Sequence, residues 1–170
     1  MILIGIGSNL AAPKFASPQE TAAAALAQLP QLGVAERRRS RWYLSEPVPP
    51  SGQPWYVNAV AACETGLSPM ALLHALLALE ERFGRRRSAP NAARTLDLDV
   101  LDYDGRRCCT ARLILPHPRL HERRFVLAPL DEIAPEWRHP LFGSSAAALL
   151  AALPAGQPVR VLGDPEAPSG

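Results

Sequence analysis

The apolar positions of this chain fall into short runs and alternating stretches that are typical of strands. Four stretches have this pattern, at residues 1–8, 34–45, 56–65 and 94–103. The fourth ends at Asp104-Gly105, a dipeptide that favours a hairpin turn. We therefore expect residues 112–116 to return as the partner of this strand, and "PVRVL" near the end of the chain to form a last strand.

Two stretches between these strands have the spacing of helices. Residues 18–29 begin after Ser17, an expected N-cap, and residues 69–83 begin after Ser68 in the same way. The order β-α-β-β-α-β predicts an α+β, ferredoxin-like sheet with helices on one face. Short C-terminal additions follow, including a small helix at 144–153.

The length of the chain fits one domain with a sizeable core. We expect a single domain over residues 1–163 of the 170, followed by a flexible tail at 164–170. The prolines at 46–55 and the arginines at 85–93 predict two exposed loops.

The stretch "RTLDLDVLDYDG" at 94–105 places aspartates inside an apolar strand. Side chains alternate along a strand, so Asp97 and Asp99 share one face while the leucines share the other. The two carboxylates lie roughly 7 Å apart on this geometry and repel by roughly 2–3 kcal/mol at an effective dielectric near 20.

Two interpretations explain what offsets the repulsion between the two carboxylates. The aspartates are either solvated on a half-exposed strand or hold a hard cation such as Mg²⁺, which commonly joins carboxylates to substrate phosphates. Arg94 and the arginine-rich loop before it favour the second interpretation and point to phosphoryl transfer. Neither a Walker-type loop nor a Gly-x-Gly-x-x-Gly motif is present in the sequence.

Composition and charge exclude several other classes of protein. The formal net charge of +2 gives no strong field for nucleic acid or membrane, and no apolar run reaches the length of a membrane span. The three cysteines do not have zinc spacing, and two of them are adjacent, which suggests a reducing compartment and hence the cytoplasm. The N-terminus lacks the features of a signal peptide.

Seven segments, taken in order, resemble the 6-hydroxymethyl-7,8-dihydropterin pyrophosphokinase family. They are "IGSNL", "YLSEPV", "QPWYVNAV", "LLALEERFGRRR", "ARTLDLDVL", "LPHPRLHERRFVLAPL" and "EIAP". The resemblance implies a ferredoxin-like enzyme of folate synthesis that transfers pyrophosphate from ATP to the pterin hydroxymethyl group and releases AMP. The loop at 85–93 lacks the aromatic residue that members of the family often carry.

The resemblance also implies roles for particular residues. Asp97 and Asp99 would bind two Mg²⁺ ions and, with Arg85 and Arg94, form the catalytic set. The residues implied for ATP are Arg85, Arg87, Arg94, Arg112, His117 and Arg123. The residues implied for the pterin are Ser45, Val48, Tyr56, Asn58 and Phe125.

A second hypothesis keeps the fold without the reaction. Ferredoxin-like domains also serve as non-catalytic pterin- or nucleotide-binding modules, and a fold does not settle a function. Paired carboxylates beside arginines favour the enzyme, and the aspartate face disfavours an RNA partner. We expect a monomer that acts on small molecules, without nucleic acid or membrane as a partner.

Overall fold

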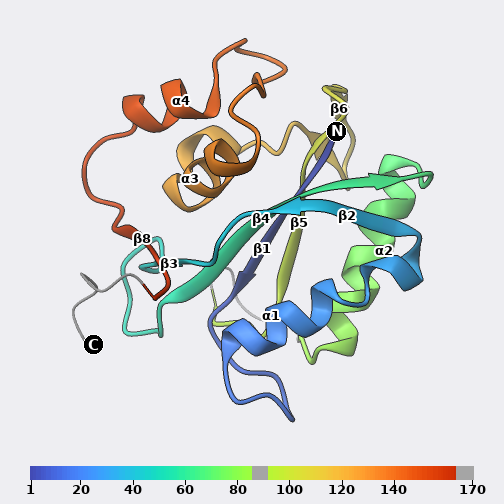
Figure 1. Ribbon diagram of the computed structural model, residues 1–170, viewed down its shortest axis with the longest axis vertical. Helices are drawn as coiled ribbons and strands as arrows, with labels where there is room; N and C mark the ends of the chain where they lie inside the picture. The colour runs from blue at the N-terminus through green and yellow to red at the C-terminus, as the bar shows by residue number, and fades with distance from the viewer. Residues whose placement is uncertain (86–91, 164–170) are drawn as a thin grey trace.

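The computed structural model describes residues 1–85 and 92–163, which form one main antiparallel sheet (Figure 1). Its strands are β1 (Ile2–Ser8), β2 (Val34–Arg39), β3 (Tyr43–Ser45), β4 (Tyr56–Thr65), β5 (Asp97–Tyr103) and β8 (Val159–Val161). The spatial order is β5-β1-β4-β3-β8, and β2 pairs with β4 next to β3. Antiparallel pairing of β4 with both β1 and β2 puts the longest strand at the centre.

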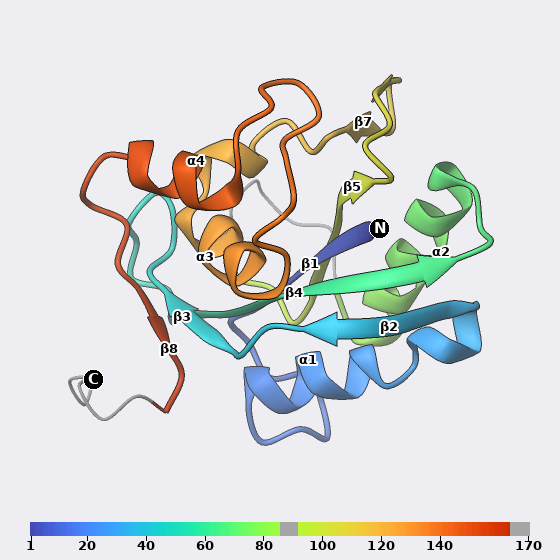
Figure 2. The same ribbon diagram turned by 45° about the horizontal axis from the view of Figure 1, so that its top comes forward.

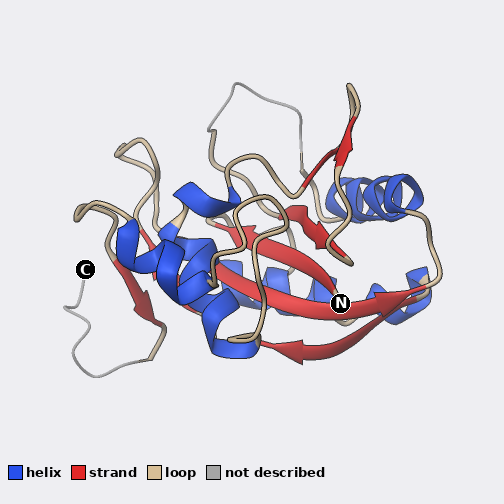
Figure 3. Cartoon of the chain, turned by 90° about the horizontal axis from the view of Figure 1, so that it is seen from above, coloured by secondary structure: helices blue, strands red, loops and turns tan. Residues whose placement is uncertain are grey.

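Helices cover both faces of this sheet (Figures 2 and 3). On one face lie α1 (Pro18–Leu26), followed by the short η1 (Leu29–Leu32), and α2 (Pro69–Arg82), as the split βαβ pattern predicts. On the other face lie α3 (Arg124–Ile133) and α4 (Ala146–Ala152), which follow the short η2 (Leu120–Glu122). The expected C-terminal additions therefore form a second helical layer, which the prediction of helices on one face did not include.

Alternation along β1 explains how one strand serves two cores. Ile2, Ile4 and Ile6 are buried against α1 and α2, whereas Leu3 is buried on the side of α3. The two serines predicted to cap α1 and α2 do so, since the hydroxyl oxygens of Ser17 and Ser68 accept backbone N–H groups of the first turns.

The prediction of one continuous strand at 34–45 is wrong, because the structure has two strands there, β2 and β3. The pairing of β2 with β4 shifts between Glu36 and Arg38, and the chain leaves the strand conformation after Arg39. The Ser40 hydroxyl accepts the Val60 N–H at 3.1 Å, and the Ser40 N–H donates to the Val60 carbonyl at 3.0 Å. The Ser40 hydroxyl thus accepts the Val60 N–H in place of a backbone carbonyl, which interrupts the strand. The next strand, β3, begins only at Tyr43.

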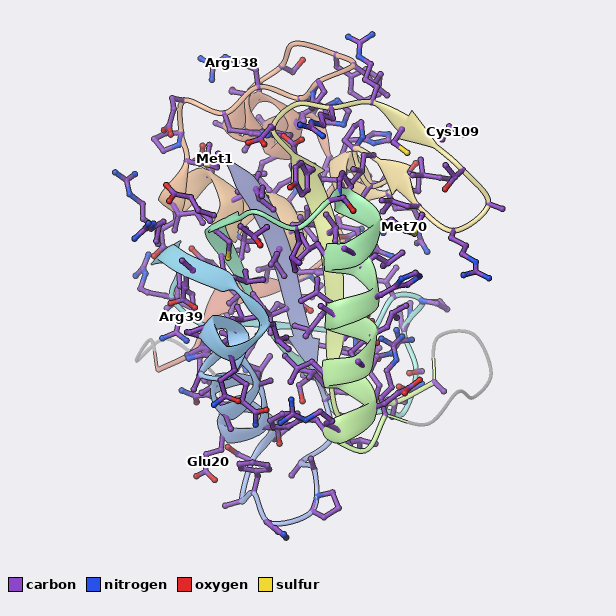
Figure 4. All side chains as sticks on the ribbon, turned by 90° about the vertical axis from the view of Figure 1, so that its right-hand side faces the viewer. Met1, Glu20, Arg39, Met70, Cys109 and Arg138 are labelled. Carbon is purple, nitrogen blue, oxygen red and sulfur yellow. The ribbon has the colours of Figure 1, made fainter. Side chains whose placement is uncertain are left out.

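The predicted partner of the fourth strand is also wrong. The turn at Asp104-Gly105 forms, with positive φ at both residues, but β5 does not pair with residues 112–116. Instead β6 (Cys108–Cys109) pairs with β7 (Ile114–Leu115) in a small separate sheet. Burial of Leu113 and Leu115 in the core beside α2 accounts for the different course of the chain. In Figure 4, Cys109 marks this hairpin and Met70 the first turn of α2.

The domain boundary at 163 stays a prediction, and the expected tail at 164–170 lies outside the described residues. Among the residues described, no helix is long and apolar enough to cross a membrane.

Candidate active site

Two glycines of β1, Gly5 and Gly7, line a cleft whose empty space, including the solvent at its open mouth, is about 950 Å³. Gly7 lies opposite Asn58 of β4 on one side and opposite Asp97 of β5 on the other. Gly5 pairs in the same way with Asp99 of β5. Only at Gly7 does the missing side chain leave space toward the cleft, where a Cβ would lie 3.5 Å from Asn58 Oδ1 and 3.8 Å from Asp97 Cβ. The space over Gly5 is taken by the Leu101 side chain, 3.2 Å from the place of a Cβ.

The carboxylates lie where strand alternation predicted them. Leu96 and Leu98 are buried in the core beside α2, while Asp97 and Asp99 line the cleft. Asp97 accepts from Arg85 at 2.7 Å and from Arg94 at 2.9 Å, one arginine on each carboxylate oxygen. Two cations therefore offset one of the two negative charges before any substrate binds.

Asp99 has weaker partners than Asp97. Its Oδ2 lies 3.6 Å from Arg123 and 3.9 Å from His117. Burial, and then the neighbouring charge of Asp97, raises the pKa of Asp99 to about 6. A divalent cation beside Asp99 would keep this carboxylate charged at lower pH.

His117 is held as a neutral ring beside Asp99. Burial, and then the charge of Arg123, lowers the pKa of His117 to about 4. Its Nδ1 accepts the Arg119 N–H at 3.1 Å, which leaves Nε2 as the protonated nitrogen facing the carboxylate. His117 can therefore donate a hydrogen bond near the carboxylates without adding a charge.

Glu80 of α2 completes the set of charges behind Asp97, a role that the sequence left unassigned. Its carboxylate is 2% exposed, accepts the Leu98 N–H at 2.6 Å and forms an ion pair with Arg85. Burial raises the pKa of Glu80 to about 7, against the opposing effects of Leu98 and Arg85. Glu80 thus fixes both strand β5, through the Leu98 N–H, and the arginine that contacts Asp97.

We expect Glu80→Ala to lower the free energy of unfolding by about 3 kcal/mol, because it leaves the buried Leu98 N–H without an acceptor and removes one of the two carboxylates paired with Arg85. This corresponds to a fall in Tm of about 6–12 °C in a chain of this size, measurable by thermal denaturation. The neighbouring Glu81 is exposed, so Glu81→Ala is a matched control that changes Tm by no more than about 2 °C. Equal shifts for the two variants would contradict the assignment.

The five residues expected to hold a pterin all line the same cleft: Ser45, Val48, Tyr56, Asn58 and Phe125. The Asn58 amide nitrogen donates to the Ser45 hydroxyl at 2.9 Å, which fixes the plane of the amide. Tyr56 extends toward the arginine end of the cleft, where its hydroxyl lies 3.5 Å from the Ala92 carbonyl oxygen. Ring, amide and hydroxyl groups thus meet on one side of the carboxylates.

The residues expected to hold ATP are distributed less evenly. Arg94 and Arg123 line the cleft, and Arg85 and His117 reach it through Asp97 and Asp99. Arg112 lies on the exposed turn between β6 and β7 and is not among the lining residues. Arg87 lies outside the described residues, as does most of the loop expected at 85–93.

The sequence analysis did not name three residues that line the cleft, Gly5, Gly7 and Gln157. The alternation "IGIG" on β1 was a readable signal, because glycine inside a strand often marks close approach of a ligand. No comparable signal existed for Gln157, which reaches the cleft from just before β8.

The donor set fits a hard divalent cation. Asp97 and Asp99 offer carboxylate oxygens, the ligands that Mg²⁺ prefers, and Mg²⁺ usually keeps several waters and binds substrate phosphates as well. The described residues contain no cluster of three or more His, Cys, Asp or Glu side chains that could hold a metal. Any cation at Asp97 and Asp99 would therefore depend on water and substrate for its remaining ligands.

Comparison with known proteins identifies one family over most of the chain. The model of the 7,8-dihydro-6-hydroxymethylpterin-pyrophosphokinase (HPPK) family matches residues 3–135. The chain is 40% identical over 153 residues to the 2-amino-4-hydroxy-6-hydroxymethyldihydropteridine pyrophosphokinase of Pseudomonas aeruginosa, covering 90% of this chain and 91% of that one. The enzyme of the same name from Synechocystis is 40% identical, covering 87% and 73%.

Solved structures agree with the fold. A triple mutant of Plasmodium falciparum HPPK-DHPS superposes with a TM-score of 0.68 at 10% sequence identity. The match covers 88% of this chain and 42% of that longer chain. At this identity the likeness supports the fold alone.

Proposed function

Because this chain belongs to the 7,8-dihydro-6-hydroxymethylpterin-pyrophosphokinase family, we propose that it transfers the pyrophosphoryl group of ATP to 6-hydroxymethyl-7,8-dihydropterin. The products are AMP and the pterin pyrophosphate, and the reaction is a step of folate biosynthesis. One observation of the structure supports this most strongly: two carboxylates flanked by three arginines share a cleft with a wall of ring, amide and hydroxyl groups.

The wall at Asn58 suits the pterin. A pterin is flat and polar, and an amide offers both a donor and an acceptor to its pyrimidine edge. The Tyr56 and Phe125 rings line the cleft and can stack on a planar ligand, each contact contributing about 0.5–1.5 kcal/mol. We propose that Ser45 holds the Asn58 amide in place while Val48 covers the apolar part of the ring.

The carboxylate end suits the triphosphate. Mg²⁺, held by Asp97 and Asp99 when bound, would neutralise phosphate charge, and we propose two ions there. We propose that Arg94 and Arg123, which contact Asp97 and Asp99, hold phosphate oxygens and that Arg85 orients Asp97. Since phosphoryl transfer depends on placement and charge, these residues would align the pterin hydroxyl with the β-phosphorus and stabilise charge moving toward AMP.

The oligomeric state and the compartment of the enzyme are also proposals. We propose a monomer that works in the cytoplasm on two small molecules. The roles of Arg87 and Arg112 at the triphosphate stay predictions.

The test is direct product analysis. Purified protein, ATP, Mg²⁺ and 6-hydroxymethyl-7,8-dihydropterin are mixed, and nucleotides are separated by chromatography. We expect AMP to form only when the pterin is present. ADP as the product would indicate a different kinase, and tight pterin binding without any product would favour the non-catalytic binding module.

A further inference from the structure

The C-terminal segment at 157–161 lies beyond the family match, which ends at residue 135, and yet it borders the cleft. Its strand β8 pairs with β3 in the register Ser45 with Val159 and Tyr43 with Val161. In Figure 1 this strand lies beside β3, at the far end of the sheet from α2. Gln157, just before β8, is the residue of this segment that lines the cleft.

The start of α3 needs a capping group that its own sequence does not supply. Arg123 occupies the N-cap position and makes no capping hydrogen bond with its side chain. The first N–H groups of a helix have no acceptor within the helix and must find one elsewhere. Gln157 supplies the acceptor for one of these N–H groups, since its Oε1 accepts the Arg124 N–H at 3.0 Å.

The same side chain also contacts the residue before Arg123. Gln157 Nε2 donates to the Glu122 carbonyl at 3.3 Å, and the Arg124 guanidinium donates to the Leu153 carbonyl at 3.4 Å. Arg123 is therefore flanked on both sides by backbone groups bound to one glutamine. Its guanidinium in turn lies 3.6 Å from Asp99 and 5.6 Å from the centre of the Phe125 ring.

We infer that Gln157 is a positioning residue for the phosphoryl-transfer site, which fixes residues 122–124 and thereby aims Arg123 at Asp99 and the bound triphosphate. This inference rests on the site proposed above, because it requires Arg123 to act on the substrate. A local cap would fix only the helix, whereas a cap from the C-terminal segment also fixes the Glu122 carbonyl on the other side of Arg123. Misplacement of a binding group by about 1 Å can lower a rate by up to about a hundredfold.

A double-mutant cycle with Arg123 tests this role. Gln157→Leu keeps a branched side chain, one atom shorter than glutamine, and removes both hydrogen bonds. We expect kcat/KM for ATP to fall about tenfold in the native background and less than about twofold in the Arg123→Ala background, because the two residues act as a unit. Gln31 is exposed and far from the cleft, so Gln31→Leu is the matched control and should change neither value.

The possible contrary outcomes have different meanings. If Gln157→Leu has no effect, or lowers kcat/KM by the same factor in both backgrounds, this inference is overturned while the proposed site stands. If Arg123→Ala itself retains full activity, the proposed site is overturned and this inference with it. Thermal denaturation of the four proteins of the cycle shows that each is folded, since Gln157 is only half-buried and its loss should change Tm by a few degrees.

Discussion

Replacing Asp97 by asparagine lowers kcat by about a thousandfold or more. The substitution removes one of the two carboxylate charges that would hold Mg²⁺, and charge stabilisation at a reacting phosphoryl group is usually the largest catalytic contribution. It also weakens the bonds to Arg85 and Arg94, at 2.7 and 2.9 Å. The measurement is the initial rate of AMP formation at saturating ATP and pterin, compared with the unaltered protein.

Asp104→Asn is the matched control for this change. Asp104 belongs to the same "DLDVLDYD" stretch, but it is exposed at the turn after β5 and pairs with the N-terminal amine. We expect its activity to stay within about twofold of the unaltered protein. Comparable loss in both variants, or retained activity in Asp97→Asn, would contradict the catalytic assignment of Asp97.

Replacing Asp99 by asparagine produces two opposite effects. Activity falls by about a thousandfold, for the same reason as at Asp97. The metal-free protein becomes more stable at pH 7.5, because burial and the charge of Asp97 raise the pKa of Asp99 to about 6 and make its charged form unfavourable. Since the side chain is 37% exposed, the gain after solvent screening is about 1–2 kcal/mol, or about 3–6 °C in Tm.

The pH dependence gives the sign of this effect. The folded-state pKa of Asp99 lies above its unfolded value, so its contribution to stability is fully present below about pH 4 and is lost as the pH rises through about 6. The difference in Tm between Asp99→Asn and the unaltered protein should therefore be near zero at pH 4 and positive at pH 7.5. His117, whose pKa is lowered to about 4 by burial and then by the charge of Arg123, has the opposite slope. It is present in both proteins, so only the change that loss of the Asp99 charge causes in His117 remains in the difference.

Added Mg²⁺ completes the test of Asp99. At pH 7.5 it should raise the Tm of the unaltered protein and leave that of Asp99→Asn unchanged, since binding stabilises only the protein that has the site. A variant less stable than the unaltered protein at pH 7.5 would show that Asp99 is favourably ionised without metal. An equal response of both proteins to Mg²⁺ would place the cation elsewhere.

Sequence reasoning was most reliable where the pattern depends on local geometry. The two caps at Ser17 and Ser68, the main strands and the common face of Asp97 and Asp99 are confirmed. It was wrong on the course of the chain after Asp104-Gly105, because a turn sequence fixes a reversal but not the partner that the returning segment will find. It also missed the interruption of the strand at Ser40, which depends on a single hydroxyl that accepts the Val60 N–H in place of a backbone carbonyl.

Asp102 shows the limit of alternation within β5 itself. Strict alternation would place it with the leucines, but the pairing with β1 shifts between Leu3 and Ile4 and turns its side chain toward the other face. There it is 2% exposed and accepts the Trp137 indole N–H at 2.7 Å. The aspartates of one short stretch thus have different roles, in the cleft, in the core and at a turn.

The sequence by itself determined that two carboxylates lie side by side next to an arginine, because the direction of a side chain in a strand depends only on its position in that strand. Its family resemblance added the reaction and the residues of the pterin wall. Only the tertiary structure decided that Glu80 lies behind Arg85, that Arg123 faces Asp99 and that Gln157 caps α3. Such contacts join segments far apart in the chain, and their distances are set by how helices pack on the sheet, which no local pattern of residues specifies.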